Sequence, residues 1–150
     1  MSVIEFNSKS EAYNELSNFH RSPFLLEGKT WTTVEHYFQA QKFPADPVLQ
    51  EKVRAAKTAL GAKRLGRTKT AAFCTDWDSI KDEVMYTGIK AKFQQNPTLA
   101  TLLAGTGSAY LIEKAPRDSY WGSGPSGCGL NKTGKIIMRV RGELSPPSTA

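Results

Sequence analysis

The sequence contains few residues of the kinds that build disulfide scaffolds or metal sites. Cys74 and Cys128 are the only cysteines among 150 residues, and His20 and His36 are the only histidines. Small secreted domains that depend on disulfides carry many more cysteines, and structural zinc sites draw most of their ligands from cysteine and histidine. We therefore expect an intracellular protein with free thiols, no metal and no cofactor.

Long apolar runs are also missing. No window approaches the roughly 20 apolar residues of a membrane span, and residues 1–6 lack the basic start and apolar run of a signal peptide. These absences predict a cytoplasmic protein with no membrane partner. The composition, 39% hydrophobic and 23% charged, is ordinary for a globular domain that buries a real core.

Acidic residues are absent from one long stretch of a chain whose net charge is +6. Residues 52–75 contain no Asp or Glu, and their cations are Lys52, Arg54, Lys57, Lys63, Arg64, Arg67 and Lys69. Such a stretch attracts phosphates, which favours a polyphosphate or nucleic-acid partner. A solvated helical surface has the same composition, so charge alone leaves both interpretations open.

Local signals predict a helix-rich α+β domain with a small β-sheet. Strands are expected at 2–6, at 24–26 and 29–31 around a turn at Gly28, at 110–112 and at 136–140. Helices are expected at 33–43, from 46, at 58–66, at 76–95 and at 96–105, because each start offers a Thr, Asp or Asn cap. We expect one domain over residues 1–144, followed by a flexible tail at 145–150.

The helix expected at 33–43 groups chemically useful side chains on one face. At 3.6 residues per turn, Glu35, Phe38, Gln39 and Lys42 share that face, and Glu35 and Lys42 lie about 10 Å apart along the axis. This spacing allows the two groups to touch different parts of one substrate. A glutamate in the first turn and a lysine in the last also suit the dipole of any helix, so the pattern alone favours a structural role.

Residues 118–135 are rich in glycine and begin at Asp118. Glycine-rich loops can bind phosphate through backbone N–H groups, and they can equally be exposed turns between two strands. Residues 129–135 fit the first positions of a P-loop. We reject a P-loop because Ile136 replaces the hydroxyl residue that would hold magnesium, and because a strand is expected next instead of a helix.

Two tryptophans are candidates for stacking on a nucleobase. Trp77 fits the apolar stripe of the helix at 76–95, whereas Trp121 lies beside Gly122 in a polar loop. Because Trp121 is harder to place in a core, its position favours it as the stacking residue.

Several motifs, spread over nearly the whole chain, occur in one order. They lie at residues 16–24, 31–43, 62–67, 77–93 and 118–134. Together they resemble the NADAR family, which includes YbiA-type N-glycosidases, and such an array is far more specific than any single motif. The resemblance implies a YbiA-like fold and hydrolysis of the N-glycosidic bond between a ribosyl group and a nitrogen base. It implies an ADP-ribose-containing substrate, with nucleic acid carrying ADP-ribosylated guanine as the expected partner.

The resemblance and the chemistry together suggest roles for individual residues. Glu35 is expected to stabilise the oxocarbenium-like transition state or to activate water. Lys42 either acts as an ammonium that holds a phosphate or protonates the departing base, or attacks the anomeric carbon as a free amine and forms a Schiff base. Asp118 either binds ribose hydroxyls or serves as a second carboxylate. The expected substrate-binding residues are Asn18, Phe19, Phe38, Gln39, Arg64, Arg67, Trp77, Tyr120, Trp121, Gly122 and Asn131.

Two further functions compete with hydrolysis of ADP-ribosylated guanine. An N-glycosidase could instead cleave early intermediates of riboflavin biosynthesis, which are small phosphorylated aminopyrimidines and need no long basic stretch. A binding module for NAD or ADP-ribose would need neither Glu35 nor Lys42. The sequence therefore favours ADP-ribosylated guanine, and it carries no signal for an oligomeric state.

Overall fold

The computed structural model describes residues 2–144 and divides the chain into two compact units. One unit joins the residues up to Ser17 with those from Phe93 onward, and the other is Asn18–Lys92. The flexible tail expected at 145–150 lies outside the described residues.

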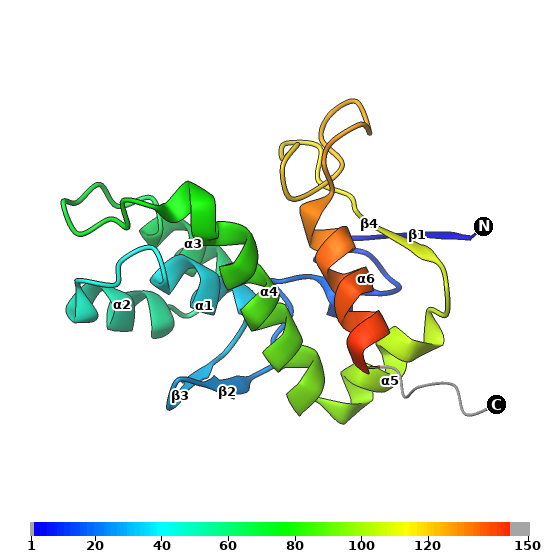
Figure 1. Ribbon diagram of the computed structural model, residues 1–150, viewed down its shortest axis with the longest axis horizontal. Helices are drawn as coiled ribbons and strands as arrows, with labels where there is room; N and C mark the ends of the chain where they lie inside the picture. The colour runs from blue at the N-terminus through cyan, green and yellow to red at the C-terminus, as the bar shows by residue number, and fades with distance from the viewer. Residues whose placement is uncertain (1, 145–150) are drawn as a thin grey trace. The chain divides into compact units, whose positions relative to one another are not determined.

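In the unit Asn18–Lys92, a short hairpin leads into a group of helices (Figure 1). Strand β2 (Phe24–Leu26) pairs antiparallel with β3 (Lys29–Trp31). Helix α1 (Val34–Ala40) then packs against both α2 (Pro47–Arg54) and α3 (Ala59–Leu65), and the long helix α4 (Trp77–Gln95) begins in the same unit.

The local signals in this unit are realised as expected. Thr33, Asp46 and Thr58 each cap the helix that follows, because each side chain accepts a hydrogen bond from a backbone N–H three residues later. The turn between β2 and β3 consists of Glu27 and Gly28, both with positive φ, which is the geometry of a tight hairpin loop. The predicted hairpin and the predicted helix starts are therefore confirmed.

Helix α1 is buried on every side. Tyr37 packs edge-on against Phe24 and Trp31 of the hairpin, with ring centroids 6.2 and 5.3 Å away. His36 is fully buried, and its two ring nitrogens hydrogen-bond to the Thr33 hydroxyl and the Ala56 carbonyl. Because its surroundings leave so little freedom, this helix can fix its polar side chains in defined positions.

The second unit contains a two-stranded parallel sheet with helices beside it (Figure 1). Strand β1 (Val3–Phe6) pairs with β4 (Tyr110–Glu113). Helix α6 (Lys132–Leu144) packs on β4 and on α5 (Pro97–Gly105), and a short 3-10 helix η1 (Asn14–Leu16) follows β1. The described elements confirm a helix-rich α+β fold with little sheet.

The strand predicted at 136–140 is wrong, because these residues lie inside α6. Ile136, Ile137 and Val140 are buried at helical spacing, and a short apolar run does not distinguish a buried helix face from a strand. One of the two reasons for rejecting a P-loop therefore fails. The other reason stands, since Ile136 still replaces the hydroxyl residue.

The cysteines, the possible metal ligands and the lengths of the helices bear on the expectations about disulfides, metals and membranes. Cys74 is buried, Cys128 is exposed, and both are free thiols as expected. Within residues 2–144, no three His, Cys, Asp or Glu side chains gather in a way that could hold a metal ion. The helices described there are all too short or too polar to span a bilayer.

Candidate functional site

Glu35 is a buried carboxylate in the first turn of α1. Its side chain is 7% exposed, and its Oε1 accepts a hydrogen bond of 2.7 Å from Gln39 Nε2 one turn later. Its backbone N–H donates to the Asn18 carbonyl at 3.1 Å, which ties the loop before the hairpin to the start of the helix. Burial of a carboxylate costs desolvation free energy, so the buried position of Glu35 marks it as a candidate functional residue.

Lys42 follows the end of α1, and its amine lies in a partly apolar setting. Lys42 Nζ is 5.9 Å from the ring centroids of both Phe38 and Trp77. Burial lowers the pKa of Lys42 most, the charge of Glu35 raises it, and the cations of Arg67, Lys63 and Lys81 lower it further. A lowered pKa increases the fraction of neutral amine, which is the nucleophilic form.

Phe38 and Trp77 form an aromatic wall beside the amine. Their ring centroids are 5.0 Å apart with the planes tilted by 58°, and both residues are buried. Trp77 is therefore buried, as the apolar stripe of its helix predicted, and its ring also lies beside the amine of Lys42. Apolar rings exclude water from the amine, which is the physical origin of its lowered pKa.

Gln39 is held between Glu35 and the backbone at Gly66. A Cβ at position 66 would overlap the Gln39 amide, so the absence of a side chain at Gly66 makes room for it. The Nε2 end of this amide donates to Glu35, while Oε1 is buried and has no hydrogen-bond partner among the described residues. In the sequence, Gly66 only ends the helix expected at 58–66, and nothing in a single sequence reports its contact with Gln39.

Asn18 provides a second unpartnered acceptor in the same unit. Its Nδ2 donates to Met85 Sδ at 3.4 Å, and its Oδ1 is buried without a hydrogen-bond partner in the described part of the chain. A buried carbonyl oxygen without a donor is unfavourable. Asn18 and Gln39 can therefore both accept hydrogen bonds from hydroxyl or amino groups of a ligand.

The predicted basic residues are placed differently from one another. Arg64 and Arg67 are both exposed, but only Arg67 is among the cations that lower the pKa of Lys42. The cation that lies over Phe19 is Lys63, at 5.9 Å from the ring centroid, and the prediction did not include it. The basic stretch is thus partly a solvated surface and partly an electrostatic neighbour of Lys42.

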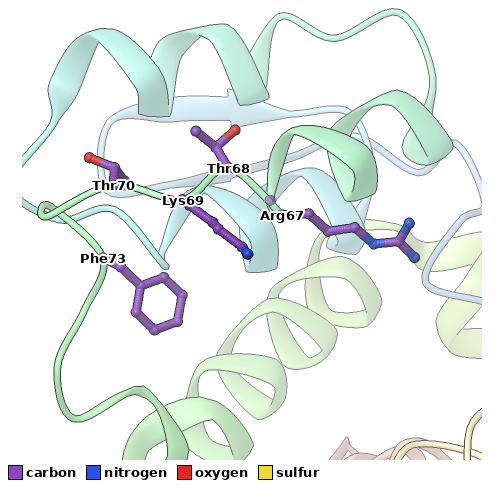
Figure 2. Close-up of a pocket in the computed structure, with 6 residues that line it drawn as sticks. Arg67, Thr68, Lys69, Thr70 and Phe73 are labelled. Carbon is purple, nitrogen blue, oxygen red and sulfur yellow. The ribbon is translucent and has the colours of Figure 1, made fainter.

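Arg67 is also one of the residues that line a surface pocket at the loop after α3. The pocket has a volume of about 470 Å³ and is lined by Gly66, Arg67, Thr68, Lys69, Thr70 and Phe73 (Figure 2). Lys69 and Phe73 extend from the same side of the loop, and Arg67 reaches away from them. The pocket begins at Gly66, against which the Gln39 amide packs.

The remaining predicted residues belong to the other unit, in the loop between β4 and α6. Asp118 Oδ1 accepts hydrogen bonds from the backbone N–H groups of Tyr120 and Trp121, at 3.0 and 2.8 Å. The rings of Tyr120 and Trp121 meet edge-on at 4.8 Å, and Lys132 Nζ lies 5.6 Å from the Tyr120 centroid. Asp118 therefore stabilises the backbone conformation of this loop through Oδ1.

Asn131 fixes the far end of the same loop to β4. Its Oδ1 accepts from the Glu113 backbone N–H at 3.0 Å, and its Nδ2 donates to the Leu111 carbonyl at 2.9 Å. Its backbone N–H donates to the carbonyl of Gly122, and a Cβ at Gly129 would overlap that same oxygen. The loop is folded tightly on itself, with many of its polar groups used internally.

The predicted site residues therefore fall into two groups. Asn18–Lys92 contains Asn18, Phe19, Glu35, Phe38, Gln39, Lys42, Arg64, Arg67 and Trp77, and it brings Glu35, Phe38, Gln39, Lys42 and Trp77 into one connected cluster. The other unit contains Asp118, Tyr120, Trp121, Gly122 and Asn131 in one loop.

Comparison with known proteins decides the family. The NADAR domain model matches residues 5–145. The N-glycosidase YbiA of Escherichia coli (strain K12) is 41% identical over 143 residues, which cover 95% of this chain and 89% of that protein. The chain belongs to the NADAR domain family.

A solved structure of YbiA and one further relative of this NADAR protein are informative. The NMR structure of the E. coli protein YbiA matches it with a TM-score of 0.86 and 40% identity, covering 95% of this chain and 84% of that one. The riboflavin biosynthesis protein PYRR, chloroplastic, of Zea mays is 37% identical over 157 residues, covering 95% of this chain and 25% of that protein.

These matches confirm the expected family, the YbiA-like fold and the enzyme class. The NADAR protein is an N-glycosidase, a hydrolase of N-glycosyl bonds. An enzyme, and not a binding module, is the alternative that the comparisons support.

Proposed function

We propose that this NADAR protein releases ADP-ribose from ADP-ribosylated guanine, in nucleic acid or in nucleotides, by hydrolysing the N-glycosidic bond. The observation that carries the proposal is the pairing of a buried carboxylate, Glu35 of α1, with an amine of lowered pKa, Lys42, just after the end of that helix. The basic loop that begins at Gly66 supports a substrate rich in phosphate.

Glu35 is proposed to act on the anomeric carbon. As the bond from this carbon to the base nitrogen breaks, positive charge develops on the carbon and the ring oxygen. A carboxylate that is desolvated and held by the Gln39 amide stabilises this charge more strongly than one in water. The same carboxylate can later take a proton from the attacking water.

Lys42 is proposed to act as the nucleophile. Its neutral amine forms a bond to the anomeric carbon while the base leaves with its bonding electron pair and gains a proton. Opening of the ribose ring gives an imine, and water then hydrolyses this Schiff base to free ADP-ribose and the original amine. Because the pKa of Lys42 is lowered, the neutral amine required for the attack is more populated at neutral pH.

Other residues are proposed to hold the substrate. The unpartnered oxygens of Asn18 and Gln39 can accept hydrogen bonds from ribose hydroxyls or from amino groups. Phe38 and Trp77 provide the apolar wall, and Arg67 provides positive charge for the pyrophosphate. For the C-terminal loop, the proposal assigns ribose binding to Asp118 and base stacking to Trp121.

Cleavage of early riboflavin intermediates is a second candidate function. It is favoured by the relative from Zea mays, whose name refers to riboflavin biosynthesis. The chemistry of Glu35 and Lys42 would be the same for an aminopyrimidine ribosyl phosphate. The phosphate-attracting loop and its exposed ring suit a larger substrate better, which places ADP-ribosylated guanine first.

The test compares the two substrate classes directly. The protein is incubated in parallel with a guanine-ADP-ribosylated oligonucleotide and with phosphorylated aminopyrimidine ribosides, and the products are identified by mass. The proposal expects release of ADP-ribose and an intact guanine-containing strand. Cleavage of the aminopyrimidine substrates with no release from the oligonucleotide would replace it by the second candidate.

A further inference from the structure

The loop that follows α3 is fixed at both of its ends beside the end of α1. At its start, Gly66 packs against the Gln39 amide. At its end, the Cys74 backbone N–H donates a hydrogen bond of 2.7 Å to the Lys42 carbonyl. The loop that forms the pocket therefore contacts both Gln39, which hydrogen-bonds to Glu35, and Lys42, which supplies the amine.

The lining of the pocket combines positive charge with hydroxyl groups. Arg67 and Lys69 supply the charge, and the lining residues of the pocket include no Asp or Glu. Thr70 Oγ1 accepts from the Ala72 backbone N–H at 3.2 Å, which leaves its own hydroxyl hydrogen to donate. Cationic side chains are groups that bind a phosphate monoester or diester, and Lys69 is the cation on the side of the loop that Phe73 shares (Figure 2).

Phe73 adds an aromatic ring to this lining. It is 39% exposed, and its ring meets the fully buried Phe43 at 6.2 Å between centroids and 73° between planes. Contact with a buried ring fixes the orientation of Phe73 while much of its surface stays open. An exposed ring held in this way, on the same side of the loop as Lys69 (Figure 2), can stack on a nucleobase.

We propose that this pocket binds a nucleoside monophosphate group, with its phosphate on Lys69 and its base on Phe73, the two side chains that extend from the same side of the loop (Figure 2). The volume of about 470 Å³ lies within the usual range of small-ligand sites, about 300–1,000 Å³. The inference rests on the proposed function for the source of the group. That source is either the adenylate half of ADP-ribose or a nucleotide next to the modified guanine.

Binding is tested without catalysis. AMP is titrated into the protein, and affinity is measured by calorimetry while the backbone amide resonances of residues 66–73 are followed by NMR. We expect AMP to shift these resonances and to bind more tightly than either adenosine or ribose 5-phosphate. Phe73→Ala should weaken AMP binding by about fivefold or more, the loss expected for one stacked base. Lys69→Ala should also weaken it, because the variant loses the charge that faces the phosphate.

Lys57→Ala is the matched control, because Lys57 is exposed in the same acid-free stretch but does not line the pocket. Arg67 is left unchanged in this series because it also lowers the pKa of Lys42. The proposal is overturned if AMP leaves the resonances of residues 66–73 unchanged. It is also overturned if Lys57→Ala weakens binding as much as Lys69→Ala, which would show attraction by general charge.

Steady-state kinetics then distinguish the two sources. If the pocket holds the adenylate half, Phe73→Ala raises KM for ADP-ribosylated guanosine and for the ADP-ribosylated oligonucleotide alike. If it holds a neighbouring nucleotide, KM rises for the oligonucleotide alone. Unchanged KM for both substrates contradicts the inference, whereas AMP binding that persists in a protein inactive on both contradicts the proposed function instead.

Discussion

Helix α1 and the loop between β4 and α6 both carry polar residues that the family resemblance singled out, yet the two regions use them differently. In the loop, Asp118 receives two backbone N–H groups, and both ends of the Asn131 amide are bonded to β4. In α1, the Gln39 amide uses only its nitrogen end, on Glu35, and leaves a buried oxygen without a partner in the described residues.

This difference separates residues that build a site from residues that have capacity left for a ligand. A polar group already bonded on both sides contributes mainly to the shape of the loop, and its removal is expected to appear first in stability. A buried polar group with an unused atom is unfavourable in the free protein and gains a partner when a ligand binds. The central chemistry therefore belongs to α1.

The largest expected effect is that of Glu35→Gln. The substitution keeps the size of the side chain and removes the charge, so turnover should fall by about 10²–10⁴-fold, as expected for loss of a positioned general acid–base group. Binding of ADP-ribose, measured by calorimetry, should stay close to that of the parent protein. Glu51→Gln is the control, because Glu51 is exposed and pairs with Arg54 on α2. Normal turnover of the Glu35 variant would remove this carboxylate from the mechanism.

The next largest effect is expected for Gly66→Ala. The added methyl group overlaps the Gln39 amide and forces it away from its place beside Glu35. Misplacement of a positioned group by about 1 Å can cost about a hundredfold in rate, so kcat should fall by about tenfold to a hundredfold.

Gly142→Ala supplies the matched control for this glycine, since a Cβ at position 142 in α6 meets open space. It should leave kcat unchanged and raise stability slightly, because alanine favours a helix. Equal kcat values for the two alanine variants would show that Gln39 does not position Glu35.

A smaller effect, of a different kind, is expected for Asn131→Ala. It removes two hydrogen bonds to β4 and places alanine at a positive φ, so the free energy of unfolding should fall by about 2–4 kcal/mol. Chemical denaturation measures this loss. Loss of activity with an unchanged free energy of unfolding would show that Asn131 binds a ligand. It would contradict the distinction between α1 and the loop between β4 and α6.

The smallest effect is a shift in pH dependence. If the neutral amine of Lys42 attacks, the single-turnover rate rises with pH through the pKa of Lys42, which lies below its ordinary value of 10.5. Arg67→Ala removes a cation that lowers this pKa, so the rising limb should move to higher pH. Lys57→Ala should not move it. A limb that moves to lower pH in the Arg67 variant would contradict the assignment.

The sequence predicted those features that depend on neighbouring residues. Thr33, Asp46 and Thr58 cap their helices through backbone groups three residues away, and the contact between Glu35 and Gln39 follows from helical spacing. Lys42 lies beyond α1, which ends at Ala40 and not near the predicted residue 43. The family and the enzyme class were also within reach, because the motifs lie in order along the chain.

The features that escaped prediction depend on contacts between distant segments. Gly66 makes room for a side chain that comes from α1, and Phe73 is oriented by Phe43. The run Ile136–Val140 became a helix because α6 packs on β4 and α5, a contact that a short apolar run cannot report.

The most direct test of the account is chemical trapping at Lys42. Borohydride is added during turnover of a guanine-ADP-ribosylated oligonucleotide, and the protein is digested and mapped by mass. The account predicts a reduced ADP-ribose adduct on the peptide that contains Lys42, and no adduct in Lys42→Ala, which should also lose activity. Full activity of Lys42→Ala, or steady turnover of the parent protein with no adduct on Lys42, would contradict it.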